Sequence, residues 1–406
     1  MVEAVIVGAV RSPIGRAVKG ALVSIRPDDL VAQVIRRGLE LVPELDPADI
    51  EDLLLGCGQP AGESGFNMAR IVGIQLGVDR MPGTTVNRYC GSSMQTTRMA
   101  FHAIRAGEGE AYISAGVETV SRFGHGTADG WPGTRNEIFT VPGLRTVRRV
   151  EEGGQDWDDP RELGLMPDAH IPMGHTAENV ALLKGVTRED MDHFAVRSQQ
   201  RAEKATDTDF WAREICPVRL PDGRMVTTDD GPRRGVTYEV VSQLPPVFRP
   251  DGRVTAGNSC PLNDGAAMLV VLSDAKARAL GLRPRARIVA TAVTALSPEI
   301  MGLGPVEATR MVLRRAGMNI ADVDQVEINE AFASQVLACQ RDLGIPDDKL
   351  NINGGAIAMG HPFGMSGARL TGTLLNSLES HDGQIGLQTM CTAGGQGMAM
   401  IVERLS

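Results

Sequence analysis

One short pattern occurs twice in the sequence and decides the fold: residues 48–56 read ADIEDLLLG, and residues 321–329 read ADVDQVEIN. Each copy combines an acidic turn with an apolar run, which predicts a turn that enters a β-strand. Each half also begins with an apolar, strand-like run, at residues 4–10 and 286–293, and later reaches a glycine-rich turn that opens a helix. This shared order of elements predicts a duplicated α/β fold in which helices cover the sheets.

The segment between the two copies has a different composition. Its first part, residues 122–172, includes Trp131 and Trp157, is charged and rich in glycine and proline, and lacks clear periodicity. Residues 176–183 and 189–204 then show apolar residues at helical spacing. Because long irregular loops in compact proteins are usually functional covers or binding loops, we expect the first part to be a substrate lid.

These differences divide the chain into three predicted parts. Residues 1–120 and 262–283 form an N-terminal half, residues 121–261 form an inserted loop domain, and residues 284–406 form a C-terminal half.

Composition limits the classes of function. The 406 residues are 42% hydrophobic and 22% charged, as in globular proteins, and the formal net charge of −9 disfavours nucleic acid as a partner. No apolar run reaches about 18 residues, and no basic region leads into a long apolar stretch, so we expect a cytoplasmic protein without a membrane span. The six cysteines are scattered, which favours reduced thiols and predicts no metal site.

Cys90 and His361 stand at sharp turns in equivalent places of the two halves. Cys90 follows the strand-like residues 84–86 and precedes a predicted helix that ends at Gly107. The positive end of a helix dipole lowers the pKa of a thiol, so Cys90 is either a nucleophile or a buried structural cysteine. His361 lies in GGAIAMGHPFGMSG, residues 354–367, which lacks the Gly-Lys-Ser/Thr ending of a phosphate-binding loop. The pseudo-symmetry predicts a Cys–His pair.

Asn329 and Cys391 each follow a predicted strand of the C-terminal half. Asn329 ends the strand at residues 326–328, where it either caps the next helix or holds a water or a carbonyl oxygen at the strand-end crevice. Cys391 follows residues 385–390 and precedes GGQG at residues 394–397. Backbone amides in such a glycine run suit an oxyanion hole beside a second thiol.

Taken together, these residues resemble the thiolases, acyl-CoA C-acetyltransferases, over essentially the whole chain. The matching blocks are NRYCGSS (87–93), NEAF (329–332), GHP (360–362) and Cys391 with its glycine run, supported by MGHTAEN (173–179) and TAGNS (255–259). The resemblance implies the thiolase fold, a duplicated five-layer α-β-α-β-α arrangement of two similar halves with an inserted loop domain. The serine-rich block around Cys90 is more similar to degradative 3-ketoacyl-CoA thiolases than to acetoacetyl-CoA enzymes.

The resemblance also implies a role for each residue. Cys90 would accept the acyl group while His361 takes its proton, and Cys391 would protonate the departing acetyl-CoA carbanion. Asn329, through a bound water, would join His361 in stabilising the enolate oxygen. A second oxyanion hole would use the backbone N–H groups of Cys90 and Ala393; a glycine is common at the latter position, so its geometry is in question if the site needs a positive φ.

Coenzyme A, as a substrate and not a cofactor, is expected to lie along the inserted segment. Matching positions place Met173 beside the pantetheine, Arg233 near the adenine, and Cys260 where a serine usually contacts a pantetheine amide. A thiol is a weaker hydrogen-bonding group than a hydroxyl, so Cys260 is a departure from the family.

We therefore predict an acetyl-CoA C-acyltransferase that cleaves a 3-ketoacyl-CoA with CoA, in fatty-acid or related acyl-chain β-oxidation. The expected partners are acyl-CoA and CoA, and the resemblance implies a homodimer or homotetramer. The length of the lid favours a medium, long or bulky acyl chain; the alternative is that this stretch only builds a subunit interface. The alternatives are an acetoacetyl-CoA thiolase and a non-catalytic acyl-CoA- or lipid-binding protein of the same fold. A decarboxylating ketoacyl synthase would have a second histidine in place of Asn329 and no Cys391.

Overall fold

The computed structural model of the chain describes residues 2–126, 133, 135–153 and 157–406. In this part of the chain ten strands form one mixed sheet, in the order β10-β11-β12-β9-β1-β8-β5-β3-β4, with β2 paired to β8. Their bounds are β1 Ala4–Arg11, β2 Gly15–Arg16, β3 Asp52–Gly56, β4 Gly83–Val86, β5 Ala111–Thr119, β8 Asn263–Ser273, β9 Ala286–Ala295, β10 Gln325–Ile328, β11 Ile385–Thr392 and β12 Gln396–Arg404. A separate hairpin joins β6 (Val218–Arg219) to β7 (Met225–Val226).

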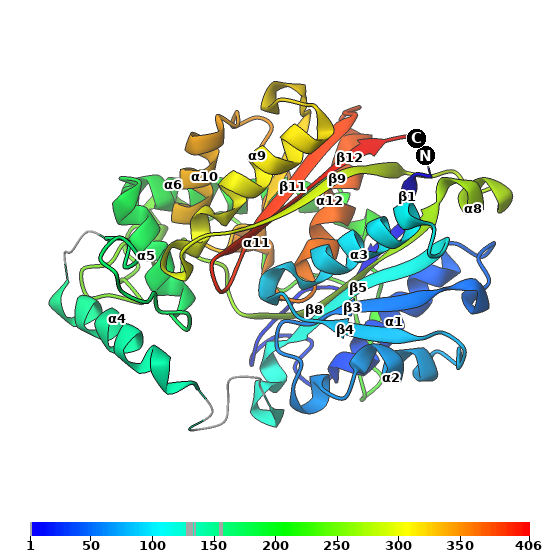
Figure 1. Cartoon of the computed structure of the whole chain (residues 1–406), viewed down its shortest axis with the longest axis horizontal. Helices are drawn as coiled ribbons and strands as arrows, with labels where there is room; N and C mark the ends of the chain where they lie inside the picture. The colour runs from blue at the N-terminus through cyan, green and yellow to red at the C-terminus, as the bar shows by residue number, and fades with distance from the viewer. Residues whose placement is uncertain (1, 127–132, 134, 154–156) are drawn as a thin grey trace.

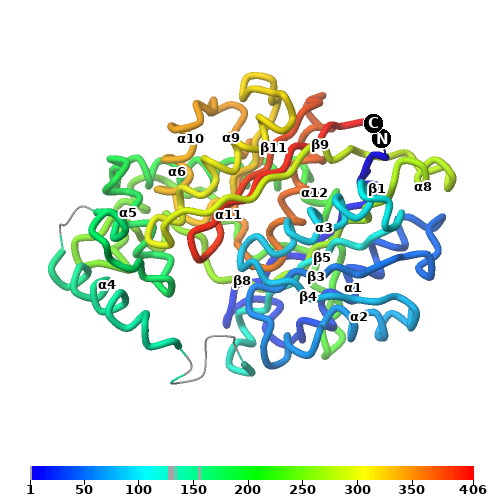
Figure 2. The backbone as a smooth tube through the Cα atoms, viewed as in Figure 1, coloured from blue at the N-terminus to red at the C-terminus, as the bar shows by residue number. Residues whose placement is uncertain are grey.

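The strand order confirms the duplication. Read outward from the short β1–β9 junction, β1-β8-β5-β3 in one half matches β9-β12-β11-β10 in the other. Strand β4 pairs in parallel with β3, and Leu350 makes an isolated parallel bridge to Val326 of β10 in the equivalent place. The two chain ends also lie close together (Figure 2), since Glu3 and Glu403 both pair with Arg287.

The helices form the outer and central layers of the fold (Figure 1). Helices α1 (Pro27–Glu40) and α2 (Met68–Gln75) cover the N-terminal half-sheet, and α9 (Gly304–Ala316) and α10 (Ala333–Leu343) lie on the C-terminal side. Helices α3 (Ser92–Ala106) and α12 (Ser366–Ser380) contact each other between the half-sheets, where all but the last two residues of α12 are buried. The expected α-β-α-β-α layering is therefore confirmed.

The inserted segment contains more helix than we expected. Helices α5 (Met173–Leu183) and α6 (Arg188–Asp207) agree with the prediction, but residues 122–172 are not an irregular loop throughout, because α4 spans Thr140–Glu152. Pro142 lies in the first turn of α4, where proline is tolerated. Short helices α7 (Tyr238–Val241), α8 (Asp274–Ala279) and α11 (Ala356–Met359) complete the set.

Of the two tryptophans in the expected lid, the structure describes only Trp157. Trp131 lies outside the described residues. Trp157 is buried, and its indole Nε1 donates to Glu299 at 2.9 Å. Trp157, in the insertion, thus holds a carboxylate of the C-terminal half in place.

A buried ion cluster fastens the insertion to both halves. The Nε of Arg11, at the end of β1, lies 2.5 Å from Glu214, and its two terminal nitrogens donate to Asp229 at 2.7 and 2.9 Å. Glu214 also accepts hydrogen bonds from Thr373 and Asn376 of α12. Because the guanidinium of Arg11 is buried, these carboxylates must neutralise its charge inside the protein.

We predict that Glu214→Ala lowers the free energy of unfolding by about 3 kcal/mol, because it leaves a buried positive charge undercompensated. Urea unfolding followed by circular dichroism would measure this loss. Asp222→Ala is the matched control, since Asp222 pairs with Arg224 at the surface, with side chains 51% and 74% exposed. The control should lose less than about 1 kcal/mol; equal losses in both variants would contradict a structural role for the buried cluster.

Candidate active site

Cys90 lies in a sharp turn between β4 and α3, as predicted. Its neighbour Tyr89 has a φ of +43°, a left-handed conformation that is unfavourable for a side chain of this size. Side chains brace the turn: Asn87 Oδ1 accepts the N–H of Tyr89 at 2.8 Å, and Ser92 Oγ accepts the N–H of Arg88 at 2.9 Å. A strained and braced turn of this kind presents one side chain in a defined direction.

The predicted lowering of the Cys90 pKa is wrong for the free protein. Part of the residue reaches the surface, but its thiol is surrounded by protein, and burial together with the Glu118 carboxylate raises the thiol pKa to about 12. The backbone N–H groups of Cys90 and Ala393 oppose this shift by donating to the sulfur. The free enzyme therefore holds Cys90 as a neutral thiol at neutral pH.

The backbone of Ala393, where relatives often have glycine, is not strained. Its N–H points at the Cys90 sulfur, and Ala393 is not among the described non-glycine residues with a positive φ. The positive values fall on Gly394 (+79°) and Gly395 (+74°), where glycine accommodates them. Alanine therefore presents its amide at this position without backbone strain.

Cys391 approaches Cys90 from β11. A methyl group added at Gly91, the residue after Cys90, would lie 2.6 Å from Cγ2 of Thr392, the residue after Cys391. Cys391 is fully buried, and its thiol pKa is raised well above the usual range by burial and by the charge that an ionised Cys90 or Cys260 would carry. Cys90, Cys260 and Cys391 are thus close enough to affect one another electrostatically.

His361 is held at the junction of the two halves by groups from the N-terminal half. Its N–H donates to Asn263 Oδ1 at 2.9 Å, and the N–H of Gly364 donates to Glu118 at 2.9 Å. Gly360 has a φ of +111°, and a Cβ there would lie 2.6 Å from Asn263, so this turn requires glycine. Helix α12, which begins after this turn, contacts the short 3-10 helix of Cys90.

The imidazole of His361 is buried and connects two polar side chains. Its Nδ1 lies 2.6 Å from Ser366 Oγ, and its Nε2 lies 3.3 Å from Asn329 Nδ2. Burial and the nearby Arg369 guanidinium lower the histidine pKa to about 3, so the ring is neutral. Ser366 Oγ also lies 2.8 Å from the carbonyl oxygen of Pro362. The Ser366 hydroxyl has one proton to donate. If it donates to Nδ1, the single ring proton lies on Nε2; if it donates to Pro362, the ring proton lies on Nδ1 and Nε2 is an acceptor.

Asn329 does not cap the following helix. Helix α10 begins at Ala333 with Phe332 at its cap position, so the N-cap interpretation is wrong. The Asn329 side chain is fully buried, and within the described residues its Oδ1 has no hydrogen-bond partner. Buried polar atoms normally have a partner, so this oxygen is suited to hold a water molecule.

A pocket of about 170 Å³ opens beside this site. Arg233 lines it, and Gln199, which accepts the Arg233 N–H, donates to the carbonyl oxygen of Ile357 in α11. Cys260 lies nearby, with its N–H bonded to Ala331 O at 3.0 Å, and Met173 packs at the start of α5. The structure thus brings Cys260 beside the residues of the catalytic set, and places Arg233 on the wall of an adjoining pocket.

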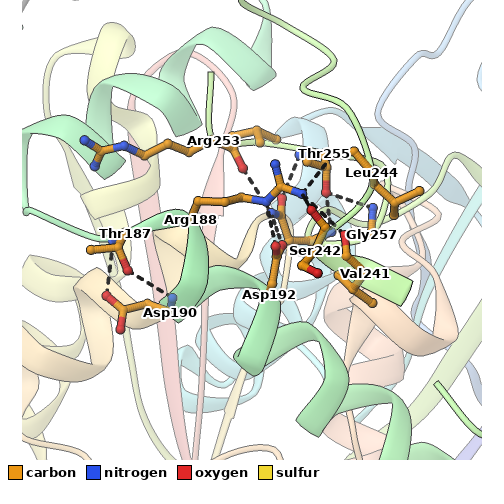
Figure 3. Close-up of polar contacts among 12 residues, drawn as sticks. Thr187, Arg188, Asp190, Asp192, Val241, Ser242, Leu244, Arg253, Thr255 and Gly257 are labelled. Carbon is orange, nitrogen blue, oxygen red and sulfur yellow. Dashed lines mark hydrogen bonds and ion pairs between the residues drawn. The ribbon is translucent and has the colours of Figure 1, made fainter. Parts of the chain in front are cut away.

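Helix α6 supports the walls of this pocket (Figure 3). Arg188 pairs with Asp192 at 2.6 Å and donates to the carbonyl oxygens of Ser242 and Leu244 at 3.2 and 2.8 Å. Asp192 also accepts from Asn258 at 2.8 Å, which positions the loop before Cys260. One ion pair therefore fixes two of the segments that line the pocket.

Comparisons with known proteins identify the family. The model of the thiolase N-terminal domain matches residues 4–275, and that of the C-terminal domain matches residues 282–404. The chain belongs to the thiolase family. It is 46% identical to the 3-oxoadipyl-CoA/3-oxo-5,6-dehydrosuberyl-CoA thiolase of Escherichia coli (strain K12) and 42% identical to a 3-ketoacyl-CoA thiolase of Shewanella frigidimarina, each over all of both chains.

Solved structures agree with this assignment. The structure of human mitochondrial 3-ketoacyl-CoA thiolase has a TM-score of 0.86 at 33% identity, and that of the Bacillus anthracis acetyl-CoA acetyltransferase has a TM-score of 0.86 at 35% identity. Each match covers 100% of this chain and 99% of the other. The thiolase is an acyltransferase, and no helix in its described part is long and apolar enough to cross a membrane.

Sequence reasoning missed three residues that position the predicted catalytic residues of this thiolase. Ser366 bonds the His361 ring, Asn263 holds the His361 backbone, and Glu118 bonds Gly364 and Gly58 while burial raises its own pKa to about 7. Ser366 could have been found, because it lies five residues after His361 in the same glycine-rich stretch. Asn263 and Glu118 come from distant strands and carry no local signal. Among the described residues no three His, Cys, Asp or Glu side chains are arranged to hold a metal ion.

We predict that Ser366→Ala slows acylation of Cys90 by about tenfold, because it removes one hydrogen bond that sets the His361 tautomer. Rapid-quench measurement of acyl-enzyme formation would show this change. Ser380→Ala, at the exposed end of the same helix, is the control and should acylate at the wild-type rate. An unchanged rate in Ser366→Ala would mean that the hydroxyl is only structural.

Proposed function

We propose that this thiolase cleaves a 3-ketoacyl-CoA with CoA, giving acetyl-CoA and an acyl-CoA shortened by two carbons, through a thioester on Cys90. The observation that carries the proposal is the meeting of two buried thiols with a neutral, hydrogen-bonded His361–Asn329 pair at the junction of the two halves. Covalent catalysis of this kind divides one difficult C–C cleavage into two acyl-transfer steps.

In the first step the Cys90 sulfur attacks the 3-keto carbon, and its proton moves to His361 Nε2. Neither group ionises readily by itself, with pKa values of about 12 and about 3. Proton transfer creates a thiolate and an imidazolium whose opposite charges attract, so ionisation is coupled to attack on the bound substrate. The N–H groups of Cys90 and Ala393 are suited to stabilise the tetrahedral oxyanion.

In the second step the bond between C2 and C3 breaks. The acyl chain remains on Cys90, and the acetyl-CoA enolate takes the proton of the Cys391 thiol. A water on the free Oδ1 of Asn329, together with His361, would stabilise the enolate oxygen. The sulfur of a second CoA then attacks the thioester, which releases the shortened acyl-CoA and restores both cysteine protons.

The names of the relatives bear on the acyl chain of the proposed substrate. The names of two relatives specify 3-ketoacyl chains that end in a carboxylate, 3-oxoadipyl-CoA and β-ketoadipyl-CoA, whereas those of others specify 3-ketoacyl-CoA in general. The shared element of these names is a thiolase that acts on a 3-ketoacyl-CoA. An optimum at acetoacetyl-CoA would instead favour an acetoacetyl-CoA thiolase.

Acyl transfer to Cys90 is tested by trapping the intermediate. Mixing the enzyme with a 3-ketoacyl-CoA in the absence of CoA and quenching in acid should give an acyl mass on the peptide that contains Cys90. Cys260→Ser should still be labelled, and Cys90→Ala should not. A label on Cys391 alone would overturn the assignment of Cys90, and no label at all would favour a non-catalytic acyl-CoA-binding protein.

Cys391 is predicted to transfer a proton without carrying the acyl chain. Cys391→Ala should still be acylated at Cys90 by a simple acyl-CoA, but should lose both thiolytic cleavage and exchange of the α-protons of acetyl-CoA into deuterated water. Nuclear magnetic resonance measures the exchange. Exchange at the wild-type rate in this variant would refute the proposed role.

A further inference from the structure

A small pocket lined by three arginines lies at the junction of the insertion and the C-terminal half. Arg145 and Arg149 come from α4, and Arg249 comes from the segment that leads to the pocket of Arg233. His175 of α5 and Glu299 complete its charged or titratable lining. The lining therefore carries three guanidinium groups and one carboxylate, an excess of positive charge that the proposed reaction has not used.

A chain of aromatic contacts connects this pocket to the catalytic residues. Phe332, three residues after Asn329, packs edge-on against Phe248 with the ring centroids 6.3 Å apart, and Phe248 packs edge-on against His175 at 6.1 Å. Phe248 directly precedes Arg249 in the sequence. One apolar wall thus runs from the Asn329 loop to the arginines.

The apolar wall also includes Cys391, the second thiol of the candidate site. Cys391, Phe332 and buried Met301 belong to one hydrophobic cluster, against which Met173 and Phe248 pack. A methyl group added at Gly174 would lie 2.2 Å from the Phe248 ring, so the wall is tightly packed at this point. An acyl chain that follows this wall away from Cys90 would leave apolar surroundings where the arginines begin.

The acidic residues around the pocket are engaged by other groups. Glu299 is buried and accepts from Arg145, from the indole of Trp157 and from the N–H of Asp168, each at 2.9 Å. Asp168 accepts from Thr146 at 2.7 Å and from a backbone N–H. These carboxylates are therefore fixed by the protein, and the charge of Glu299 acts on both Arg145 and Arg149.

Arg249 is buried, but the bonds to its acidic partner are long. Its side chain is 5% exposed, yet its bonds to Asp251, whose side chain is 45% exposed, are long at 3.3 and 3.4 Å. Burial and the Arg249 charge lower the pKa of His175, so this ring adds no positive charge of its own, and its Nδ1 is buried without a partner among the described residues. An anion in the pocket would relieve the cost of this buried charge.

We infer that Arg249, together with Arg145 and Arg149, binds the terminal carboxylate of a 3-ketoacyl-CoA whose acyl chain ends in a carboxylate. Guanidinium groups bind carboxylates through paired, charge-assisted hydrogen bonds, which makes arginine the appropriate residue. This inference rests on the proposed thiolytic activity and specifies its substrate class. The other anions that the pocket could meet are the phosphates of CoA, and the experiment separates the two sources.

The test compares substrates that differ only in the terminal group. Each pair has equal chain length: 3-ketoadipyl-CoA with 3-ketohexanoyl-CoA, and 3-ketosuberyl-CoA with 3-ketooctanoyl-CoA. The wild-type enzyme should have a higher kcat/KM for the carboxylate member of at least one pair. In Arg249→Met the ratio of the two kcat/KM values should fall by at least about tenfold, because a buried charge pair is lost. Arg249→Lys should retain part of the ratio.

The matched control is Arg148→Met, on the exposed side of the same helix as Arg145 and Arg149; it should leave the ratio unchanged. If Arg249→Met does not fold, Arg149→Met gives the same readout. Equal losses for both members of a pair would place the arginines on CoA phosphates or in a structural role and overturn the inference. A wild-type ratio of one or less would also overturn it.

A binding measurement distinguishes failure of this inference from failure of the proposed reaction. Cys90→Ala should bind adipyl-CoA more tightly than hexanoyl-CoA in isothermal titration calorimetry, and adding Arg249→Met should remove the difference. This preference does not depend on turnover. If the protein prefers adipyl-CoA but the wild-type enzyme cleaves neither substrate, only the proposed reaction is rejected. If the wild-type enzyme is active but the binding preference is absent, only the carboxylate site is rejected.

Discussion

The contact between the N-terminal ends of α3 and α12 is the constraint on which the rest of the structure depends. A Cβ at Gly367 would lie 2.2 Å from the backbone nitrogen of Met94, and the N–H of Ala368 donates to Ser93 Oγ at 2.9 Å. Any larger residue at Gly367 would separate the two helices. Because Cys90 precedes one helix and His361 precedes the other, this close approach brings the proposed nucleophile of one half to the proposed base of the other.

Burial at this junction determines the electrostatics of the site. It raises the thiol pKa of Cys90 to about 12, lowers that of His361 to about 3 and raises that of Glu118 to about 7. In each case desolvation is the largest cause and disfavours the charged form. At neutral pH the free enzyme therefore keeps Cys90 and His361 neutral, whereas Glu118 is partly ionised. In the proposed reaction Cys90 and His361 would ionise as a pair, when a substrate carbonyl takes up the developing charge.

The sequence allowed most of the fold to be predicted, and it indicated the residues that the fold brings together at the candidate site. The duplicated strand and turn patterns are local, so they indicated the elements at residues 48–56 and 321–329, and the glycine-rich turns indicated Cys90 and His361. Long-range effects could not be read in this way. The direction of the Cys90 pKa shift depends on burial and on Glu118, which lies 28 positions away in the numbering of the chain.

Helix α4 shows a different limit of sequence reasoning. Its apolar residues Val141, Leu144 and Val147 do recur at helical spacing, but all three are exposed, and a proline and a glycine lie between the first two. The helix was therefore obscured by residues that normally mark loops.

The duplicated fold has become chemically asymmetric. The N-terminal half supplies the thiol that would hold the acyl group and the side chains that orient the His361 turn, while the C-terminal half supplies His361, Asn329 and Cys391. Neither half contains a complete set. The insertion lies against the C-terminal half through Glu299 and Phe248. In the proposed reaction, changes in its sequence would alter the surroundings of the acyl chain without moving the groups at the junction. Such a separation would let one catalytic frame serve acyl chains of different chemistry.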